Sequence, residues 1–169
     1  MAVKTDMSAQ VFVSVGSNIN AAVNVRLAAM LLQREFGEVQ LSTVYRSASA
    51  GFSGDDFLNL IIGFTTERSP HDCAAVMTKL EHEAGRSEDQ HGFVSRPLDL
   101  DMVLYGDLVD TDPALRVPRD DIDKYAFVLG PLAEIAPGFR HPLNGKTMAE
   151  LWTAFDQSAS PMTVEPIKL

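Results

Sequence analysis

Two aspartates separated by one residue are the clearest candidates for chemistry in this sequence of 169 residues. Asp99 and Asp101 lie in the apolar run 98–105, which reads as a β-strand. In a strand their carboxylates share a face about 7 Å apart, and they repel each other unless solvent or a cation compensates their charge. Mg²⁺ commonly binds one or two carboxylates together with substrate phosphates. The pair therefore favours metal-assisted phosphoryl chemistry, with a solvated sheet face as the alternative.

Composition and charge narrow the classes of function. The chain has 14 Lys plus Arg against 23 Asp plus Glu, a formal net charge of −9. Such a chain repels a nucleic-acid backbone, so we expect no nucleic-acid partner, and an anionic substrate needs local arginines or metal ions. No apolar stretch approaches the ~20 residues of a membrane span, so we expect no membrane partner. Cys73 is the only cysteine, and we expect a buried thiol in a cytoplasmic monomer.

The hydrophobic periodicity predicts one α+β domain over residues 1–169, since no linker or repeat interrupts it. The order strand, helix, strand, strand, helix, strand is that of a ferredoxin-like βαββαβ core, with a mostly antiparallel sheet and helices packed on one side. A helical C-terminal extension follows. We expect strands at 10–15, 39–45, 58–66 and 98–105, helices at 20–36 and 70–84, exposed loops at 47–56 and 86–96, and helical segments at 121–127, 131–135 and from 147.

Capping residues and apolar spacing support these elements. Ser69 before Pro70 is a typical helix start, and Thr147 with Glu150 fits a capping box. In the strand 98–105, alternation places Leu98, Leu100, Met102 and Leu104 together on the face opposite the aspartates. The apolar positions at helical spacing are Val23, Leu27, Met30 and Leu31 in the first helix, Val76, Met77, Leu80 and Ala84 in the second, and Met148, Leu151, Trp152 and Phe155 in the last.

Segments from 11 to 142 follow the order and spacing of one known family. They are the opening strand with its Gly16-Ser17-Asn18 turn, the segments 42–46 and 56–59, the stretch 81–106, and the segments 117–118 and 126–137. On these residues the chain resembles the 6-hydroxymethyl-7,8-dihydropterin pyrophosphokinase family of folate biosynthesis. The resemblance implies transfer of pyrophosphate from ATP to the hydroxymethyl group of a pterin, giving AMP.

The resemblance also implies the site residues. Asp99 and Asp101 would hold two Mg²⁺ ions on the phosphates of ATP, and Arg86 and Arg96 would complete the catalytic set, since an arginine fork donates bidentate hydrogen bonds to phosphate. Asn59 would bind the pterin edge, and Phe57 and Phe127 would stack on the ring. The nucleotide-binding positions are Glu81, Arg86, Arg96, Arg116 and Arg119, and the pterin-binding positions are Ser47, Ala48, Ala50, Phe57, Asn59 and Phe127.

Simpler interpretations remain open at these positions. Phe57 and Phe127 could be core residues, and Asn59 could cap a turn. Glu88 and Asp89 stand where members of the family are basic, and their charge should weaken triphosphate binding. A second hypothesis is therefore a divergent paralogue that binds a pterin-like ring without pyrophosphoryl transfer, or that acts on another acceptor.

Overall fold

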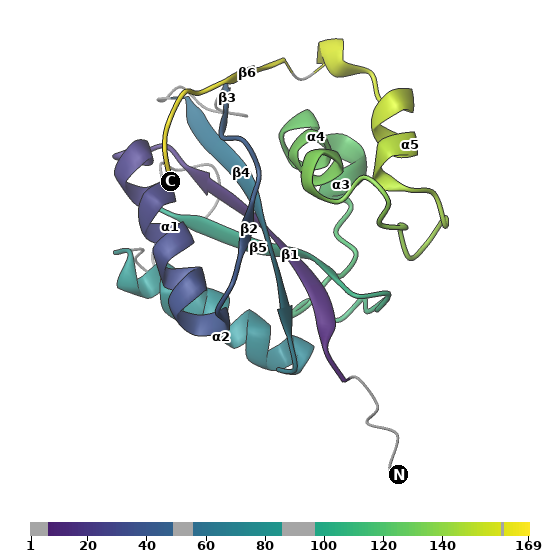
Figure 1. The fold of residues 1–169 in the computed structure, drawn as a ribbon, viewed down its shortest axis with the longest axis horizontal. Coiled ribbons are helices and arrows are strands. Elements are labelled where there is room, and N and C mark those ends of the chain that lie inside the picture. The colour runs from purple at the N-terminus through teal and green to yellow at the C-terminus, as the bar shows by residue number, and fades with distance from the viewer. Residues whose placement is uncertain (1–6, 49–55, 86–96, 160) are drawn as a thin grey trace.

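An antiparallel sheet forms the centre of the molecule (Figure 1). The computed structural model describes residues 7–48, 56–85, 97–159 and 161–169, so the expected loop 86–96 and most of the loop 47–56 lie outside the described residues. The strands follow the order β5-β1-β4-β3-β6, with β2 also paired to β4. Their bounds are β1 (Ala9–Ser17), β2 (Gln40–Leu41), β3 (Tyr45–Ser47), β4 (Phe57–Thr66), β5 (Asp99–Tyr105) and β6 (Met162–Val164).

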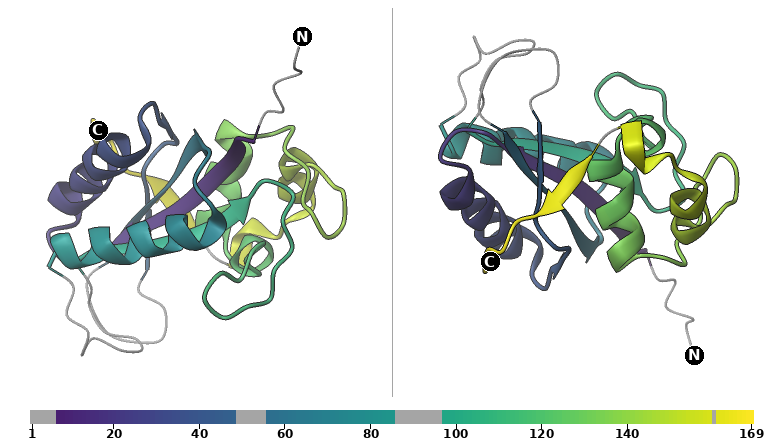
Figure 2. Two further views of the ribbon diagram at one scale, coloured as in Figure 1. Left: turned by 90° about the horizontal axis from the view of Figure 1, so that it is seen from below. Right: turned by 90° about the horizontal axis from the view of Figure 1, so that it is seen from above.

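Helices cover both faces of this sheet, as Figure 2 shows. The pair α1 (Ala21–Phe36) and α2 (Pro70–Glu83) lies on one face. On the other lie α3 (Asp121–Lys124), α4 (Ala126–Ile135) and α5 (Met148–Ala154), followed by a 3-10 turn, Gln157–Ala159. The α+β class, the βαββαβ core and the helical extension are thereby confirmed. No helix in the described part of the chain is long and apolar enough to cross a membrane.

The sheet separates the interior into two apolar clusters, and the central strand β1 contributes side chains to both. Val11, Val13 and Val15 are fully buried in the cluster beneath α1 and α2. Phe12 points the other way, into the cluster beneath α3, α4 and α5. The same alternation sends Ser14 to the face of Phe12, and it remains partly exposed. One end of this second face is therefore left uncovered by the apolar core.

A bulge corrects the expected face of Leu104. In the β1–β5 ladder Val13 lies opposite Met102, but Phe12 lies opposite Leu104, so Val103 is an extra residue. An extra residue inverts the alternation beyond it. Leu104 therefore packs with Phe12 on the α4 face, whereas Met102 stays beneath α1 and α2 with Leu98 and Leu100. The prediction that all four apolar residues share one face is wrong for Leu104.

The expected strand 39–45 is two short strands, β2 and β3. Ser42 lies between them, and its hydroxyl accepts a hydrogen bond from the amide of Ile61 at 2.8 Å. That side chain takes the place of a backbone acceptor, which interrupts the ladder. Ser47, expected in an exposed loop, is instead the buried last residue of β3. The strand β6 was not predicted.

The expected apolar positions of α1 are only partly correct. Val23 and Met30 are 64% and 61% exposed, so they lie on the solvent side of the helix. The buried side chains of α1 are Asn24, Val25, Ala28, Ala29, Leu31 and Leu32. In α2, Met77 and Leu80 are buried as expected, with Cys73 and Glu81 beside them.

The helix ends and the thiol largely follow the predictions. The expected segment 121–127 breaks at Tyr125, which separates α3 from α4, and Pro131 lies inside α4 rather than at a helix start. The hydroxyl of Thr147 accepts a hydrogen bond from the amide of Glu150 at 3.1 Å. Cys73 is fully buried, and burial raises the pKa of its thiol to about 11, so it is a core residue rather than a nucleophile.

The cap of α2 provides a test of the local structure. The hydroxyl of Ser69 accepts a hydrogen bond from the amide of Asp72 at 3.1 Å. Replacing Ser69 with Ala removes this acceptor and should lower the free energy of unfolding by about 1 kcal/mol in urea titrations. Ser69→Thr keeps the oxygen and is the matched control. Equal stability of Ser69→Ala and the wild type would contradict the assigned cap.

Candidate active site

The two aspartates lie on the uncovered end of the sheet, on the same face as Phe12. Asp99 is opposite Gly16 of β1, and Asp101 is opposite Ser14. On the other side of β1, Gly16 is opposite Asn59 of β4. Directly paired residues of an antiparallel sheet point the same way, so the side chains of Asp99, Asp101 and Asn59 share one face. Both aspartates are partly exposed.

Gly16 lies between Asp99 and Asn59 on the sheet, and it has no side chain to fill the space between them. A Cβ at Gly16 would lie 3.4 Å from Oδ1 of Asn59 and 3.8 Å from Cδ1 of Phe57. Any larger side chain would therefore enter the space between the aspartates and Asn59. Sequence reasoning placed Gly16 only in a turn, and its position at the end of an alternating strand was the available signal.

The buried carboxylate of Glu81 holds the backbone between the two aspartates. Glu81 of α2 is only 9% exposed, and its Oε2 accepts a hydrogen bond at 2.9 Å from the amide of Leu100, the residue between the two aspartates. Ser17 at the end of β1 also bonds through its hydroxyl to the carbonyl of Pro97. Glu81 thus holds the backbone of β5 from α2, and Ser17 of β1 holds the segment just before β5. A nucleotide contact of Glu81 stays a prediction.

Arg119 brings positive charge to the aspartate pair. Its Nη1 lies 3.9 Å from Oδ1 of Asp101, and its Nε lies 3.6 Å from Oδ2 of Asp121. Its backbone amide donates to the carbonyl of Val103 at 3.0 Å, which ties the loop to β5. The Nε atom is buried and has no hydrogen-bond partner among the described residues. The guanidinium thus lies between the carboxylates of Asp101 and Asp121.

The donor set suits a hard cation that brings further ligands with it. Among the described residues, no group of three or more His, Cys, Asp and Glu side chains could enclose a metal ion. Two carboxylates on a strand are too few for a closed structural site. Two carboxylates are enough for Mg²⁺, because water and substrate phosphates complete its octahedral coordination. The aspartate pair therefore fits Mg²⁺ bound together with a phosphate ligand.

Polar and aromatic side chains meet beside Gly16 on the β4 side. The Nδ2 of Asn59 donates a 2.7 Å hydrogen bond to the hydroxyl of Ser47, and both residues are buried. This bond holds the amide of Asn59 in one orientation, so Asn59 does not merely cap a turn. Phe57 is partly buried beside them, and Ala48 follows exposed after β3. The structure thus groups Ser47, Phe57 and Asn59.

Phe127 lies in the first turn of α4, above the same face of the sheet. It is partly buried, packs on the cluster that contains Phe12, and stacks on Tyr125 with ring centroids 5.0 Å apart. Its ring therefore has a core contact and an accessible part. A contact with a bound ring stays a prediction.

The remaining predicted residues are not brought to the aspartates by any described contact. Arg116 is exposed in the turn before α3, with a positive φ of 49°, and its amide donates to the carbonyl of Asp112. Arg86, Arg96 and Ala50 lie outside the described residues. The roles of these four residues stay predictions.

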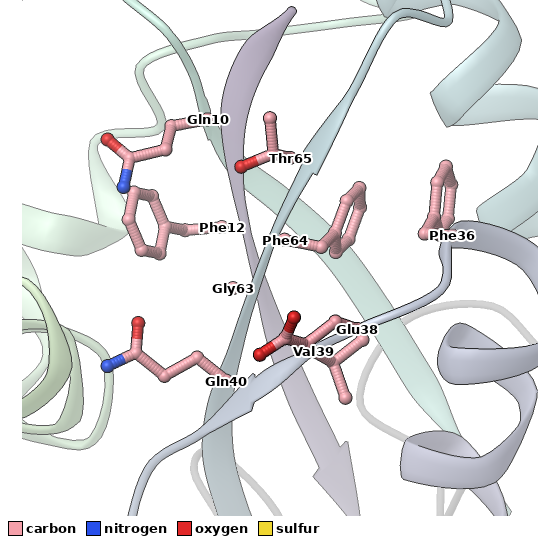
Figure 3. A pocket seen from close by; sticks show the side chains of 9 residues that line it. All are labelled: Gln10, Phe12, Phe36, Glu38, Val39, Gln40, Gly63, Phe64 and Thr65. Atoms are coloured by element: carbon pink, nitrogen blue, oxygen red, sulfur yellow. The ribbon is translucent and has the colours of Figure 1, made fainter.

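A separate hollow lies toward the other end of the strands (Figure 3). It has a volume of about 600 Å³ and opens beside Gly63, with Gln10 and Gln40 on one side of the sheet and Phe36 and Phe64 on the other. None of the predicted site residues lines it.

Comparisons with known proteins point to one family. The family 7,8-dihydro-6-hydroxymethylpterin-pyrophosphokinase matches residues 12–137. The 2-amino-4-hydroxy-6-hydroxymethyldihydropteridine pyrophosphokinase of Aquifex aeolicus is 34% identical over 144 residues, covering 84% of this chain and 89% of that protein. The Pseudomonas aeruginosa protein of the same name is 33% identical over 152 residues, covering 88% and 93%.

A solved structure supports the fold alone. The wild-type HPPK-DHPS of Plasmodium falciparum superposes with a TM-score of 0.67 at 12% sequence identity. The match covers 87% of this chain, which spans 44% of that longer protein.

The contact between Glu81 and Leu100 can be tested by its effect on stability. Glu81→Ala leaves the buried amide of Leu100 without its acceptor and should lower the free energy of unfolding by about 1–3 kcal/mol. Glu81→Gln keeps an oxygen acceptor and should lose less. The matched control is Glu83→Ala on the same helix, where an exposed pair with Arg34 is lost at a cost below about 1 kcal/mol. Equal losses at positions 81 and 83 in urea titrations would contradict the contact.

Proposed function

This chain belongs to the 7,8-dihydro-6-hydroxymethylpterin-pyrophosphokinase family, and we propose that it transfers pyrophosphate from ATP to the hydroxymethyl group of 6-hydroxymethyl-7,8-dihydropterin in folate biosynthesis, releasing AMP. The hydroxymethyl oxygen attacks the β-phosphorus of ATP, and the bond from that phosphorus to the α-phosphate oxygen breaks. The product carries the β- and γ-phosphates. The observation that carries this proposal is the family match over residues 12–137 around one sheet face that holds both Asp99 and Asp101.

Asp99 and Asp101 are the proposed ligands of two Mg²⁺ ions that enter with ATP. When bound, Mg²⁺ neutralises phosphate charge and aligns the triphosphate for in-line attack. The chain's contribution is to hold both carboxylates on one strand face, with Glu81 bonded to the intervening amide. Such positioning reduces the reorganisation needed when the phosphates arrive.

Arginines are the proposed partners of the triphosphate oxygens. Arg119 already lies beside Asp101, and its side chain is 26% exposed. A phosphate oxygen is a suitable acceptor, because a charge-assisted hydrogen bond to a guanidinium is short and strong. By their family positions, we assign Arg86 and Arg96 to catalysis and phosphate binding, and Arg116 and Glu81 to the nucleotide side.

The pterin is proposed to lie beside Gly16. The orientation of the Asn59 amide by Ser47 supports recognition of a ring edge that carries both donors and acceptors. Phe57 and Phe127 are the proposed stacking residues, and backbone groups of Ser47, Ala48 and Ala50 complete the pterin side. This arrangement places the acceptor hydroxymethyl group next to the aspartates.

We also propose that residues 1–169 form a single domain that works as a cytoplasmic monomer, with ATP and the pterin as its partners. Support for the single domain comes from the interior, where both apolar clusters pack on the same sheet.

An AMP-release assay tests the proposed reaction. Incubation with ATP, Mg²⁺ and 6-hydroxymethyl-7,8-dihydropterin should produce AMP only when all three are present. Asp99→Ala and Asp101→Ala should each lower kcat at least about a hundredfold, because each removes a carboxylate from the charge-stabilising site. Asp107→Ala, at an exposed position just beyond β5, is the matched control. No AMP from the wild type at high protein concentration would overturn the proposal.

The role of Arg119 is tested by comparing two Michaelis constants. Arg119→Ala should raise the KM for Mg-ATP about tenfold, because a charge-assisted hydrogen bond to phosphate is lost, while the KM for the pterin stays unchanged. Arg34→Ala, which removes an exposed arginine on α1, should change neither constant. Equal rises in both constants for Arg119→Ala would show a general structural role instead.

A further inference from the structure

The C-terminal segment of the chain lies beyond the region matched by the family. Residues 162–167, called the strap below, begin with β6 and lie 25 residues or more after the family match ends at 137. From α5 the chain crosses the end of the sheet next to β3 and finishes beside α1 (Figure 2, right). The strap therefore contacts the strand that carries Ser47.

The strap makes β3 an interior strand. Tyr45, Arg46 and Ser47 pair with β4 on one side and with Val164, Thr163 and Met162 on the other. A strand of three residues forms few hydrogen bonds with one neighbouring strand. Pairing with the second neighbour, β6, therefore contributes much of what holds β3 in place. The position of Ser47 thus depends on β6 as well as on β4.

Further contacts set the register of the strap. The Nε and Nη2 of Arg46 donate to the two carboxylate oxygens of Glu165 at 3.0 and 3.1 Å, and these bonds lower the pKa of Glu165. The amide of Glu165 donates to the carbonyl of Val44 at 2.9 Å, and just beyond the strap the Nε of Arg26 donates to the carbonyl of Lys168 at 2.9 Å. The strap is therefore held at several points between β3 and α1.

Met162 joins two parts of the pterin side. It lies opposite Ser47 in the β3–β6 ladder, so its side chain points toward the α4 face. A Cβ at Gly130 of α4 would lie 2.6 Å from Cε of Met162 and 3.0 Å from Cη2 of Trp152. The methionine thus packs against α4 one helical turn after Phe127.

We propose that Met162 is a positioning residue for the pterin side, setting the spacing between β3, which carries Ser47, and α4, which carries Phe127. This inference rests on the proposed function. Met162 acts through these two elements and touches no reacting atom. Its contact requires glycine at position 130, because any side chain there would displace the methionine.

A second contact joins the same elements at their other ends. Glu134 of α4 accepts hydrogen bonds from the hydroxyl of Tyr45 at 2.9 Å and from the hydroxyl of Thr43 at 2.7 Å. These bonds hold the start of β3, two positions before Ser47. Met162 is the contact directly opposite Ser47, so its loss should move Ser47 while Glu134 keeps the rest of β3 in place.

Calorimetry with two ligands tests the proposal. The Kd of 6-hydroxymethyl-7,8-dihydropterin should rise about tenfold in Met162→Ala, measured with Mg²⁺ and a non-hydrolysable ATP analogue. The reason is that a displaced Ser47 no longer has the position that pterin binding requires. The Kd of the Mg²⁺–ATP analogue should stay within about twofold, because the aspartates lie on β5, at the opposite end of the strand order from β6. In steady state, the KM for the pterin should rise more than kcat falls.

Matched variants separate positioning from general stability. Met162→Leu conserves volume and should retain pterin binding, and Val164→Ala changes an exposed residue of the same strand, 62% exposed, with no expected effect. Gly130→Ala displaces Met162 without removing any core atom, so it should weaken pterin binding even if Met162→Ala does not fold. Trp152 is the only tryptophan, and its emission should shift in Met162→Ala but not in Val164→Ala.

The outcomes are distinguishable from a failure of the proposed function. Pterin binding by the wild type with unchanged binding by both Met162→Ala and Gly130→Ala would overturn the inference and leave the function standing. Equal weakening of pterin and Mg²⁺–ATP analogue binding would also overturn it, because that result indicates general destabilisation. A wild type that binds no pterin would overturn the proposed function and this inference together.

Discussion

The constraint on which the site depends is the burial of Leu98, Leu100 and Met102 beneath α1 and α2. Because side chains alternate along β5, burying these three residues obliges Asp99 and Asp101 to share the opposite face. The charged pair is therefore held by the apolar core, and Glu81 of α2 holds the backbone between the two residues. The packing of apolar residues on one face of the sheet thus places two carboxylates side by side on the other face.

The two faces of the sheet serve different purposes. On the α1–α2 face, β1 carries the buried residues Val11, Val13 and Val15, whereas the α4 face changes from apolar to polar along that strand. Phe12 is buried beneath the helices, but Ser14 and Gly16 remain partly exposed. The bulge at Val103 sends Leu104 to the α4 face, where it packs with Phe12 in the apolar cluster. One strand pair thus supports an apolar core at one end and a polar site at the other.

Periodicity and capping residues were enough to predict the βαββαβ core, the α+β class and the shared face of Asp99 and Asp101. They could not locate the bulge, since one extra residue in a ladder leaves no periodic trace. Ser42 interrupts a strand through a side-chain hydrogen bond that depends on its neighbour, Ile61. The pairing of β6 joins segments more than a hundred residues apart, so no local pattern marks it. The contact between Glu81 and Leu100 joins residues 19 apart on different elements, and no periodic pattern marks it either.

The central claim is that both metal ions and the phosphates bind at the aspartate pair on the α4 face of the sheet. The most direct measurement is the anomalous scattering of Mn²⁺ in crystals grown with Mn²⁺, a non-hydrolysable ATP analogue and 6-hydroxymethyl-7,8-dihydropterin. The account predicts anomalous peaks bridging the phosphates and the carboxylates of Asp99 and Asp101, with the pterin beside Asn59. Peaks elsewhere, or phosphates on the α1–α2 face, would contradict it.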